Sequence, residues 1–234
     1  MSLPATHRRR LREVWRSAGW PCRDAVEIEL LAAGLLARRD DGEGRETLRV
    51  TDAGLQVLAA TLARNRAAFD AHEALVARVA LEMQRAGRIV WRGLALRAPL
   101  SAEGEAQARW VTSMPDVYSI RHTTVEDYAE PVVHEIKVRR ADLLADLRHA
   151  DKGAAYRAMA SQCWYVLARG IARADEVPAD YGVMLADDYG LEVARAAPRR
   201  AMRVPFAAWM VLARANAEPP PEDDGQALLG APPH

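Results

Sequence analysis

A carboxylate and an ammonium group interrupt an otherwise apolar segment in the second half of the chain. Residues 132–138 read Val-Val-His-Glu-Ile-Lys-Val, and their β-branched side chains predict a buried strand. Side chains alternate along a strand, so Glu135 and Lys137 are expected on the same face. On an exposed edge strand such a pair would contribute only about 0–1 kcal/mol. Inside a sheet its burial is costly, which suggests a function.

The use of lysine supports this second interpretation. The chain has 32 Lys and Arg residues, and only Lys137 and Lys152 are lysines. An ammonium group is a compact point charge, whereas guanidinium is a planar fork with five donors. Where arginine provides the ordinary surface charge, a lysine indicates a site at which one oxygen must be approached closely.

A second carboxylate, Asp116, precedes this strand in the chain. Residues 113–120 read Ser-Met-Pro-Asp-Val-Tyr-Ser-Ile, which predicts a turn followed by another strand. Asp116 together with Glu135-x-Lys137 resembles the signature of the PD-(D/E)XK nuclease superfamily. That resemblance implies an α/β fold in which helices flank a mixed, restriction-endonuclease-like sheet.

Residues 133–198 resemble, more narrowly, the MmcB-like DNA-repair family. The resemblance rests on the strand at residues 134–137, the helix start Arg140-Ala141-Asp142, the spacing Lys152-x-x-x-Tyr156, and the segments at residues 164–168 and 178–193. It implies a nuclease, a hydrolase of phosphodiester bonds, that acts on DNA in repair.

The resemblance also implies roles for individual residues. Asp116 and Glu135 would bind Mg²⁺ or Mn²⁺, with the main-chain carbonyl of Ile136 as a third oxygen ligand. Lys137 would orient the attacking water and oppose the developing negative charge. Asp116, Glu135 and Lys137 are therefore the predicted catalytic residues of a metal-dependent endodeoxyribonuclease.

Five further residues are candidates for a metal or phosphate contact. Superfamily members often supply a glutamate from the first core helix, here Glu73 or Glu82, and some branches place a glutamine beside the metal. Gln162, expected on the helix after the central strand, is the candidate for that position. Lys152 and Tyr156 lie about one helical turn apart and would face the same phosphate. The simpler interpretation of all five is a solvated or packed side chain.

The first 66 residues predict a separate α+β module. Apolar residues at helical spacing, Leu11, Val14 and Trp15 among them, predict helices over residues 7–18 and 23–36. Asp-Gly and Glu-Gly before residues 47–50 predict a β-hairpin. A long helix capped by Thr51 or Asp52 should follow and break around residues 65–66. This order resembles a winged helix of the MarR or PadR type.

Arginines of this module are candidates for contacts with DNA. Arg38, Arg39 and Arg45 on the wing would bind phosphates, and a basic arm precedes them at Arg8, Arg9, Arg10 and Arg12. Acidic residues around the wing dilute its charge. Contact with another protein, or formation of a homodimer, is an equal alternative to DNA binding.

Composition sets the outer limits of these predictions. The 234 residues are 50% hydrophobic with zero formal net charge, so DNA binding must come from local patches. We expect the winged-helix module at residues 1–66, the nuclease-like domain at residues 67–215 and a disordered tail at residues 216–234. Within the second domain, the sequence predicts a helix over residues 69–86, a strand over residues 88–96 and a polar connection over residues 99–109. Cys22 and Cys163 are predicted to be reduced core thiols. Without an apolar span or a signal peptide, the chain is expected to be cytoplasmic and to have no membrane partner.

Two alternatives to a nuclease stay open. One is a non-catalytic DNA-binding or regulatory protein that retains the nuclease fold, and the other is a phosphate-binding structural partner in a repair complex. Convergence of Asp116 and Glu135 on one cavity, with Lys137 at its rim, would favour the enzyme. The sequence does not distinguish single-stranded, duplex, branched or damaged DNA, or RNA.

Overall fold

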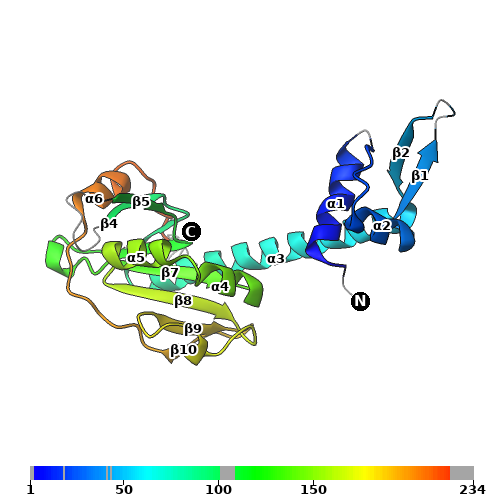
Figure 1. The fold of residues 1–234 in the computed structure, drawn as a ribbon. Helices are drawn as coiled ribbons and strands as arrows, with labels where there is room; N and C mark the ends of the chain where they lie inside the picture. Colours follow the sequence, from blue (N-terminus) through cyan, green and yellow to red (C-terminus); the bar gives the residue numbers. More distant parts are fainter. Residues whose placement is uncertain (1–2, 18, 41, 43, 101–108, 222–234) are drawn as a thin grey trace, which may run out of the picture. The chain divides into compact units, whose positions relative to one another are not determined.

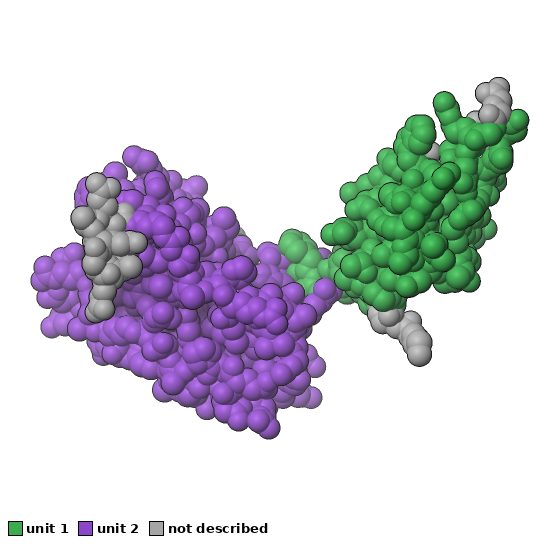
Figure 2. All heavy atoms as spheres, in the orientation of Figure 1, with its two compact units in different colours: residues 1–69 green, residues 70–234 purple. Residues whose placement is uncertain are grey.

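The computed structural model describes residues 3–17, 19–40, 42, 44–100 and 109–221. The chain divides into two compact units, Met1–Phe69 and Asp70–His234 (Figure 2). The tail predicted over residues 216–234 lies mostly outside the described residues. No helix within the described residues is long and apolar enough to cross a membrane.

The first unit packs helices and a hairpin around a small apolar core. Its elements are α1 (Ala5–Arg16), α2 (Ala25–Ala32), β1 (Leu36–Asp40), β2 (Glu46–Val50) and the first part of α3 (Asp52–Arg85). Strands β1 and β2 pair antiparallel. The buried core consists of Leu11, Val14, Leu30, Leu35, Leu36, Leu48 and Val50. The predicted order of helix, helix, hairpin and helix is confirmed.

Three local predictions in this unit are wrong. Helix α2 ends early, and Gly34 follows it with a φ of +68°. Leu36 therefore begins β1 instead of closing a helix. Trp15, predicted on the buried face of α1, is 60% exposed. Cys22, predicted in the core, is exposed, whereas Cys163 is buried.

Helix α3 is continuous where the sequence predicted two helical stretches separated by a break. Thr51 caps it as expected, because its hydroxyl accepts a hydrogen bond from the main-chain N–H of Gly54 at 3.2 Å. The helix then continues through residues 65–66 to Arg85. Residues 55–85 contain no Gly or Pro and many Ala, so nothing in the local sequence breaks the helix. Gly87, with a φ of +75°, follows its end.

The second unit is built on a six-stranded mixed sheet with the order β10-β9-β8-β7-β6-β3. Its strands are β3 (Arg88–Arg92), β6 (Val117–Arg121), β7 (Val132–Lys137), β8 (Gln162–Ala168), β9 (Gly182–Ala186) and β10 (Leu191–Arg195). Strands β7, β8 and β9 run parallel, and β3, β6 and β10 pair antiparallel with their neighbours. The predicted strand at residues 132–138 is therefore interior, not an edge strand.

Helices cover both faces of this sheet. On one face Ile136 and Val166 pack against Val76 and Val79 of α3. The other face packs against α5 (Ala150–Met159), α6 (Phe206–Leu212) and the hairpin of β4 (Leu96–Leu100) and β5 (Arg109–Ser113). Helix α4 (Arg140–Asp146) follows β7 (Figure 1). Short 3₁₀ helices occur at Glu126–Tyr128 and Ala174–Glu176. The predicted mixed sheet flanked by helices is confirmed.

The hairpin of β4 and β5 was not predicted from the sequence. A single strand was expected over residues 88–96, but Gly93, with a φ of +58°, separates β3 from β4. Residues 99–109 were expected to form a polar connection. Their ends instead belong to β4 and β5, which pair antiparallel with Pro99 opposite Trp110. The buried residues Leu96 and Ala98 hold this hairpin on the core.

Gly182 provides a test of the packing between β8 and β9. It lies opposite Trp164 in the register, and a Cβ atom at this position would overlap the Trp164 ring. Gly182→Ala should lower the free energy of unfolding by about 1–3 kcal/mol, measured by urea denaturation. Gly190→Ala is the control, because a Cβ atom there meets nothing within 4 Å. Equal stability of the two variants would contradict this packing.

Candidate functional site

Strands β6 and β7 bring Asp116 beside the segment Glu135-Ile136-Lys137. Asp116 directly precedes β6, and Val117 pairs with His134 across the two strands. The Oδ2 atom of Asp116 accepts a hydrogen bond from the main-chain N–H of Ile136 at 2.7 Å. The antiparallel register thus joins two residues that are 20 positions apart in the chain.

Glu135 is the most enclosed charged group of the site. Its residue exposure is 4%, and both carboxylate oxygens accept hydrogen bonds. Oε1 accepts from Lys137 Nζ and, at 2.5 Å, from Lys152 Nζ. Oε2 accepts from the Tyr156 hydroxyl at 2.7 Å. A buried carboxylate needs such donors, because water no longer solvates it.

Two residues that the sequence analysis did not single out complete the network. Asp146, at the end of α4, accepts hydrogen bonds from Lys152 at 2.5 Å and from the Tyr165 hydroxyl at 2.8 Å. Lys137 Nζ lies 3.9 Å from Asp146 Oδ2. Both lysines of the chain therefore meet here. We call the whole set the carboxylate–lysine cluster: Asp116, Glu135, Lys137, Asp146, Lys152, Tyr156 and Tyr165.

A weak signal for Asp146 was present in the sequence. A buried lysine requires an acidic partner, and Asp146 and Asp151 both lie close to Lys152 in the chain. Nothing in the sequence favoured Asp146 over Asp151, which the structure places in a surface ion pair with Arg109. Nothing in the sequence distinguished Tyr165 from its neighbours in an apolar strand.

Burial shifts the pKa values of several groups in the cluster. The pKa of Asp116 is raised by burial and by the nearby Glu135 carboxylate, although the Ile136 N–H and His72 oppose the shift. His72 Nε2 lies 3.4 Å from Asp116 Oδ2. The pKa values of Tyr156 and Tyr165 are raised by burial and by adjacent carboxylates. Both phenols therefore keep their protons and act as donors.

Lys152 remains an ammonium group although it is largely buried. Burial by itself lowers its pKa, but Glu135 and Asp146 together raise it above the ordinary value. The cluster then contains three carboxylates and only two ammonium groups. Counting these side chains alone, one negative charge is in excess, and Asp116, which neither lysine contacts, has His72 as its basic neighbour.

The oxygen atoms beside Asp116 are of the type that a hard divalent cation binds. Burial and the nearby Glu135 carboxylate both raise the pKa of Asp116, and a cation would relieve this repulsion. Mg²⁺ commonly takes one or two carboxylates and keeps several waters. Asp116, Glu135 and the Ile136 carbonyl would supply such oxygens. Across the described part of the chain, no group of three or more His, Cys, Asp or Glu residues could hold a metal.

Three other candidate ligands are not members of the cluster, although His72 links one of them, Glu73, to Asp116. Glu82 pairs with Arg85 at 3.1 Å, and Glu73 is 3.2 Å from His72. Gln162 begins β8 instead of lying on a helix, and it donates to the Ala197 carbonyl at 3.3 Å. It lies opposite Val132, at the far end of β7 from Lys137. Its predicted position on a helix was wrong, because a local pattern does not show where a helix ends and the next strand begins; its contact with a metal stays a prediction.

The candidate DNA contacts of the first unit are partly neutralised. Arg38 pairs with Glu46 at 3.0 Å, and the Arg45 guanidinium lies 5.8 Å from the centre of the Trp20 ring. Arg39 is exposed on β1. In the basic arm, Arg10 pairs with Asp24 at 2.7 Å. These contacts leave both interpretations of the module open.

Comparisons with known proteins add little to this description. No protein-family model matches the chain. No curated protein matches it either. Among solved structures, the chain is similar to the SPO1766 protein of unknown function from Silicibacter pomeroyi. The identity is 21%, over 56% of this chain and 73% of that one, and the TM-score is 0.39. A likeness this distant assigns no activity.

The hydrogen bond from Tyr165 to Asp146 can be tested by deletion. Tyr165→Phe removes one donor from a carboxylate whose side chain is only 10% exposed, and should cost about 1–3 kcal/mol in the free energy of unfolding. Tyr189→Phe is the control, because Tyr189 is 97% exposed. Urea denaturation measures both. An unchanged free energy of unfolding in Tyr165→Phe would show that Asp146 does not depend on this donor.

Asp116→Asn should stabilise the protein at neutral pH in the presence of EDTA. The folded-state pKa of Asp116 is raised above its ordinary 3.8, so its ionisation is less favourable in the folded than in the unfolded chain. This unfavourable contribution is absent below pH 3.8, grows as the pH rises through the folded-state pKa, and is then constant. Asparagine avoids it and still accepts the Ile136 N–H.

The measurement is urea denaturation of both proteins from neutral pH to below pH 3.8. The advantage of Asp116→Asn should disappear at the acidic end. Asp188→Asn, at an exposed position between β9 and β10, should match the wild type throughout. A variant less stable than wild type at neutral pH would contradict the repulsion between Asp116 and Glu135.

Proposed function

We propose that this protein is a metal-dependent DNA nuclease of the PD-(D/E)XK superfamily that acts in DNA repair with Mg²⁺ or Mn²⁺. The observation that carries the proposal is the convergence of Asp116, Glu135 and Lys137 at β6 and β7 of a mixed sheet. Two carboxylates and one lysine are the side chains that such phosphodiester hydrolysis requires. The excess negative charge of the cluster supports the binding of a cation.

Each residue of the cluster has a role in this proposal. Asp116, Glu135 and the Ile136 carbonyl hold the metal, which when bound polarises a phosphoryl oxygen and lowers the pKa of a bound water. Lys137, already held against Glu135, orients the attacking water and opposes negative charge on the phosphate. Its side chain is 11% exposed, so little water screens its charge.

Lys152 and Tyr156 support this arrangement from α5. Lys152 has two carboxylate partners, so Asp146 still anchors its ammonium group when Glu135 binds something else. Tyr156 fixes one Glu135 oxygen and also donates to the Met114 carbonyl at 3.2 Å. The phenol has one proton, which the shorter contact directs to Glu135 and which the Met114 carbonyl shares, so the hydroxyl joins Glu135 to the turn that carries Asp116.

One observation favours the non-catalytic alternative. Both oxygens of Glu135 are already satisfied by Lys137, Lys152 and Tyr156. The cluster is therefore a complete hydrogen-bonded network of the protein's own groups, which would also serve a DNA-binding or regulatory protein with this fold. Activity decides between the two functions.

The test is cleavage of labelled single-stranded, duplex and branched DNA with Mg²⁺ or Mn²⁺. Glu135→Gln and Lys137→Met should each reduce the cleavage rate by about 10²-fold or more, and EDTA should abolish it. Glu192→Gln, at an exposed position on β10, is the matched control and should cut normally. If no substrate is cut although the protein binds DNA and the variants bind equally well, the non-catalytic function is the better assignment.

A further inference from the structure

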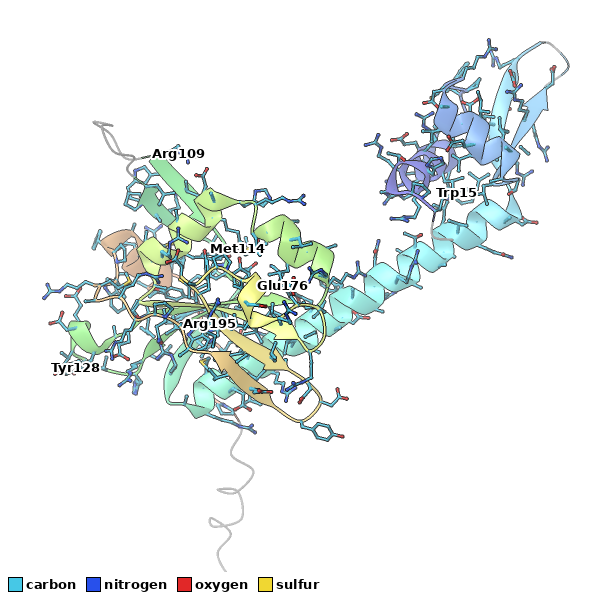
Figure 3. All side chains as sticks on the ribbon, turned by 60° about the horizontal axis from the view of Figure 1, so that its bottom comes forward. Trp15, Arg109, Met114, Tyr128, Glu176 and Arg195 are labelled. Carbon is cyan, nitrogen blue, oxygen red and sulfur yellow. The ribbon has the colours of Figure 1, made fainter. Side chains whose placement is uncertain are left out.

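A strip of exposed side chains runs along the β4–β5 hairpin toward the carboxylate–lysine cluster. We call Arg97, Trp110, Thr112 and Met114 the β5 strip; all four are exposed. Arg97 lies opposite Thr112 in the register, and the alternation of side chains places Trp110 and Thr112 on the same face. Figure 3 labels Arg109, at the start of β5, and Met114, directly after its end. Asp116 follows two residues later.

The strip presents two apolar surfaces to solvent beside a cation. Trp110 is 50% and Met114 57% exposed, and β-strand geometry places them about 13 Å apart. The Arg97 guanidinium lies 5.6 Å from the centre of the Trp110 ring. An exposed tryptophan next to an arginine is the combination on which unpaired bases stack.

A pocket of about 700 Å³ continues the strip toward the cluster. It is lined by residues of β5 and of the segment that begins α5, including Ser113, Met114, Arg148 and Lys152. Ser113 is 5% exposed, and its hydroxyl has no hydrogen-bond partner within the described structure. Its side chain points to the buried face of β5, opposite Thr112, so Ser113 lines the pocket without offering this hydroxyl to solvent.

The charges of the strip and of the pocket favour an anion. Arg97 on the strip and Arg148 in the pocket lining form no ion pair with a carboxylate of the described residues, although many other arginines do. Asp151, the acidic residue in the pocket lining, is paired with Arg109 at 2.8 Å. One unneutralised guanidinium group on the strip and one in the pocket suit the phosphates of a nucleic acid.

We propose that the β5 strip and this pocket bind a single-stranded nucleic acid and lead it to the carboxylate–lysine cluster. Bases stack on Trp110 and Met114, and phosphates bind Arg97 and Arg148. A duplex offers no free base faces to such a strip, because its bases are paired and stacked inside. This inference rests on the proposed function, since it names the form of the substrate.

The first measurement is binding of a fluorescent single-stranded oligonucleotide to the full chain in EDTA, followed by anisotropy. Trp110→Ala should weaken binding about 5-fold to 100-fold, whereas Trp110→Phe should retain most of it. Tyr189→Ala, which removes a 97% exposed aromatic residue elsewhere, should bind like the wild type. Far-UV circular dichroism checks that each variant is folded.

A second measurement tests the phosphate contacts. Arg97→Gln and Arg148→Gln should each reduce the dependence of log K on log salt by about 0.7. Arg173→Gln is the control, because Arg173 is paired with Asp175 at 3.0 Å. Unchanged slopes in both variants would overturn the role of these arginines.

The two proposals fail in different ways. If the protein binds single strands through Trp110 but cuts none with Mg²⁺, binding by the strip is supported and the nuclease assignment is contradicted. If it cuts single strands and Trp110→Ala changes neither binding nor cutting, binding by the strip is contradicted and the nuclease assignment is supported. Equal affinity for duplex and single strand, both independent of Trp110, also overturns the strip.

Discussion

The burial of the Glu135 carboxylate is the constraint on which the second unit depends. A carboxylate taken out of water loses several kcal/mol of hydration unless donors replace it. Here three donors do so, from Lys137, Lys152 and Tyr156. Lys137 belongs to the same strand as Glu135, whereas Lys152 and Tyr156 belong to α5. The position of this helix against β7 is therefore fixed by polar contacts as well as by its apolar face.

The same constraint extends to the neighbouring elements. Lys152 needs a second carboxylate, which α4 supplies as Asp146, and Asp146 in turn takes a hydrogen bond from Tyr165 on β8. A satisfied buried network of this kind holds its members in one arrangement. Asp116 is held differently, by a main-chain N–H and by His72 Nε2 at 3.4 Å. It is the carboxylate of the cluster that neither lysine contacts.

Local signals in the sequence were sufficient for part of the fold. The β-branched segment around Glu135 predicted β7, and the Gly-containing turn predicted the hairpin of β1 and β2. Where the predictions were wrong, a glycine conformation or long-range packing decided. Gly93 divides one expected strand into β3 and β4, and β4 and β5 form a hairpin because Leu96 and Ala98 are covered by the core. The local sequence of two segments does not show whether they pair as strands.

The sequence by itself determined which groups can do chemistry: two carboxylates, two lysines in a chain dominated by arginine, and the alternation that puts Glu135 and Lys137 on one face. Tertiary structure alone decided which groups meet. Asp146 and Tyr165 joined the cluster, and Gln162 lay at the other end of its strand. The physical reason is that strand alternation and helical spacing act over a few residues. Contacts between β6, β7, β8, α4 and α5 depend on sheet order and register, which only the folded chain defines.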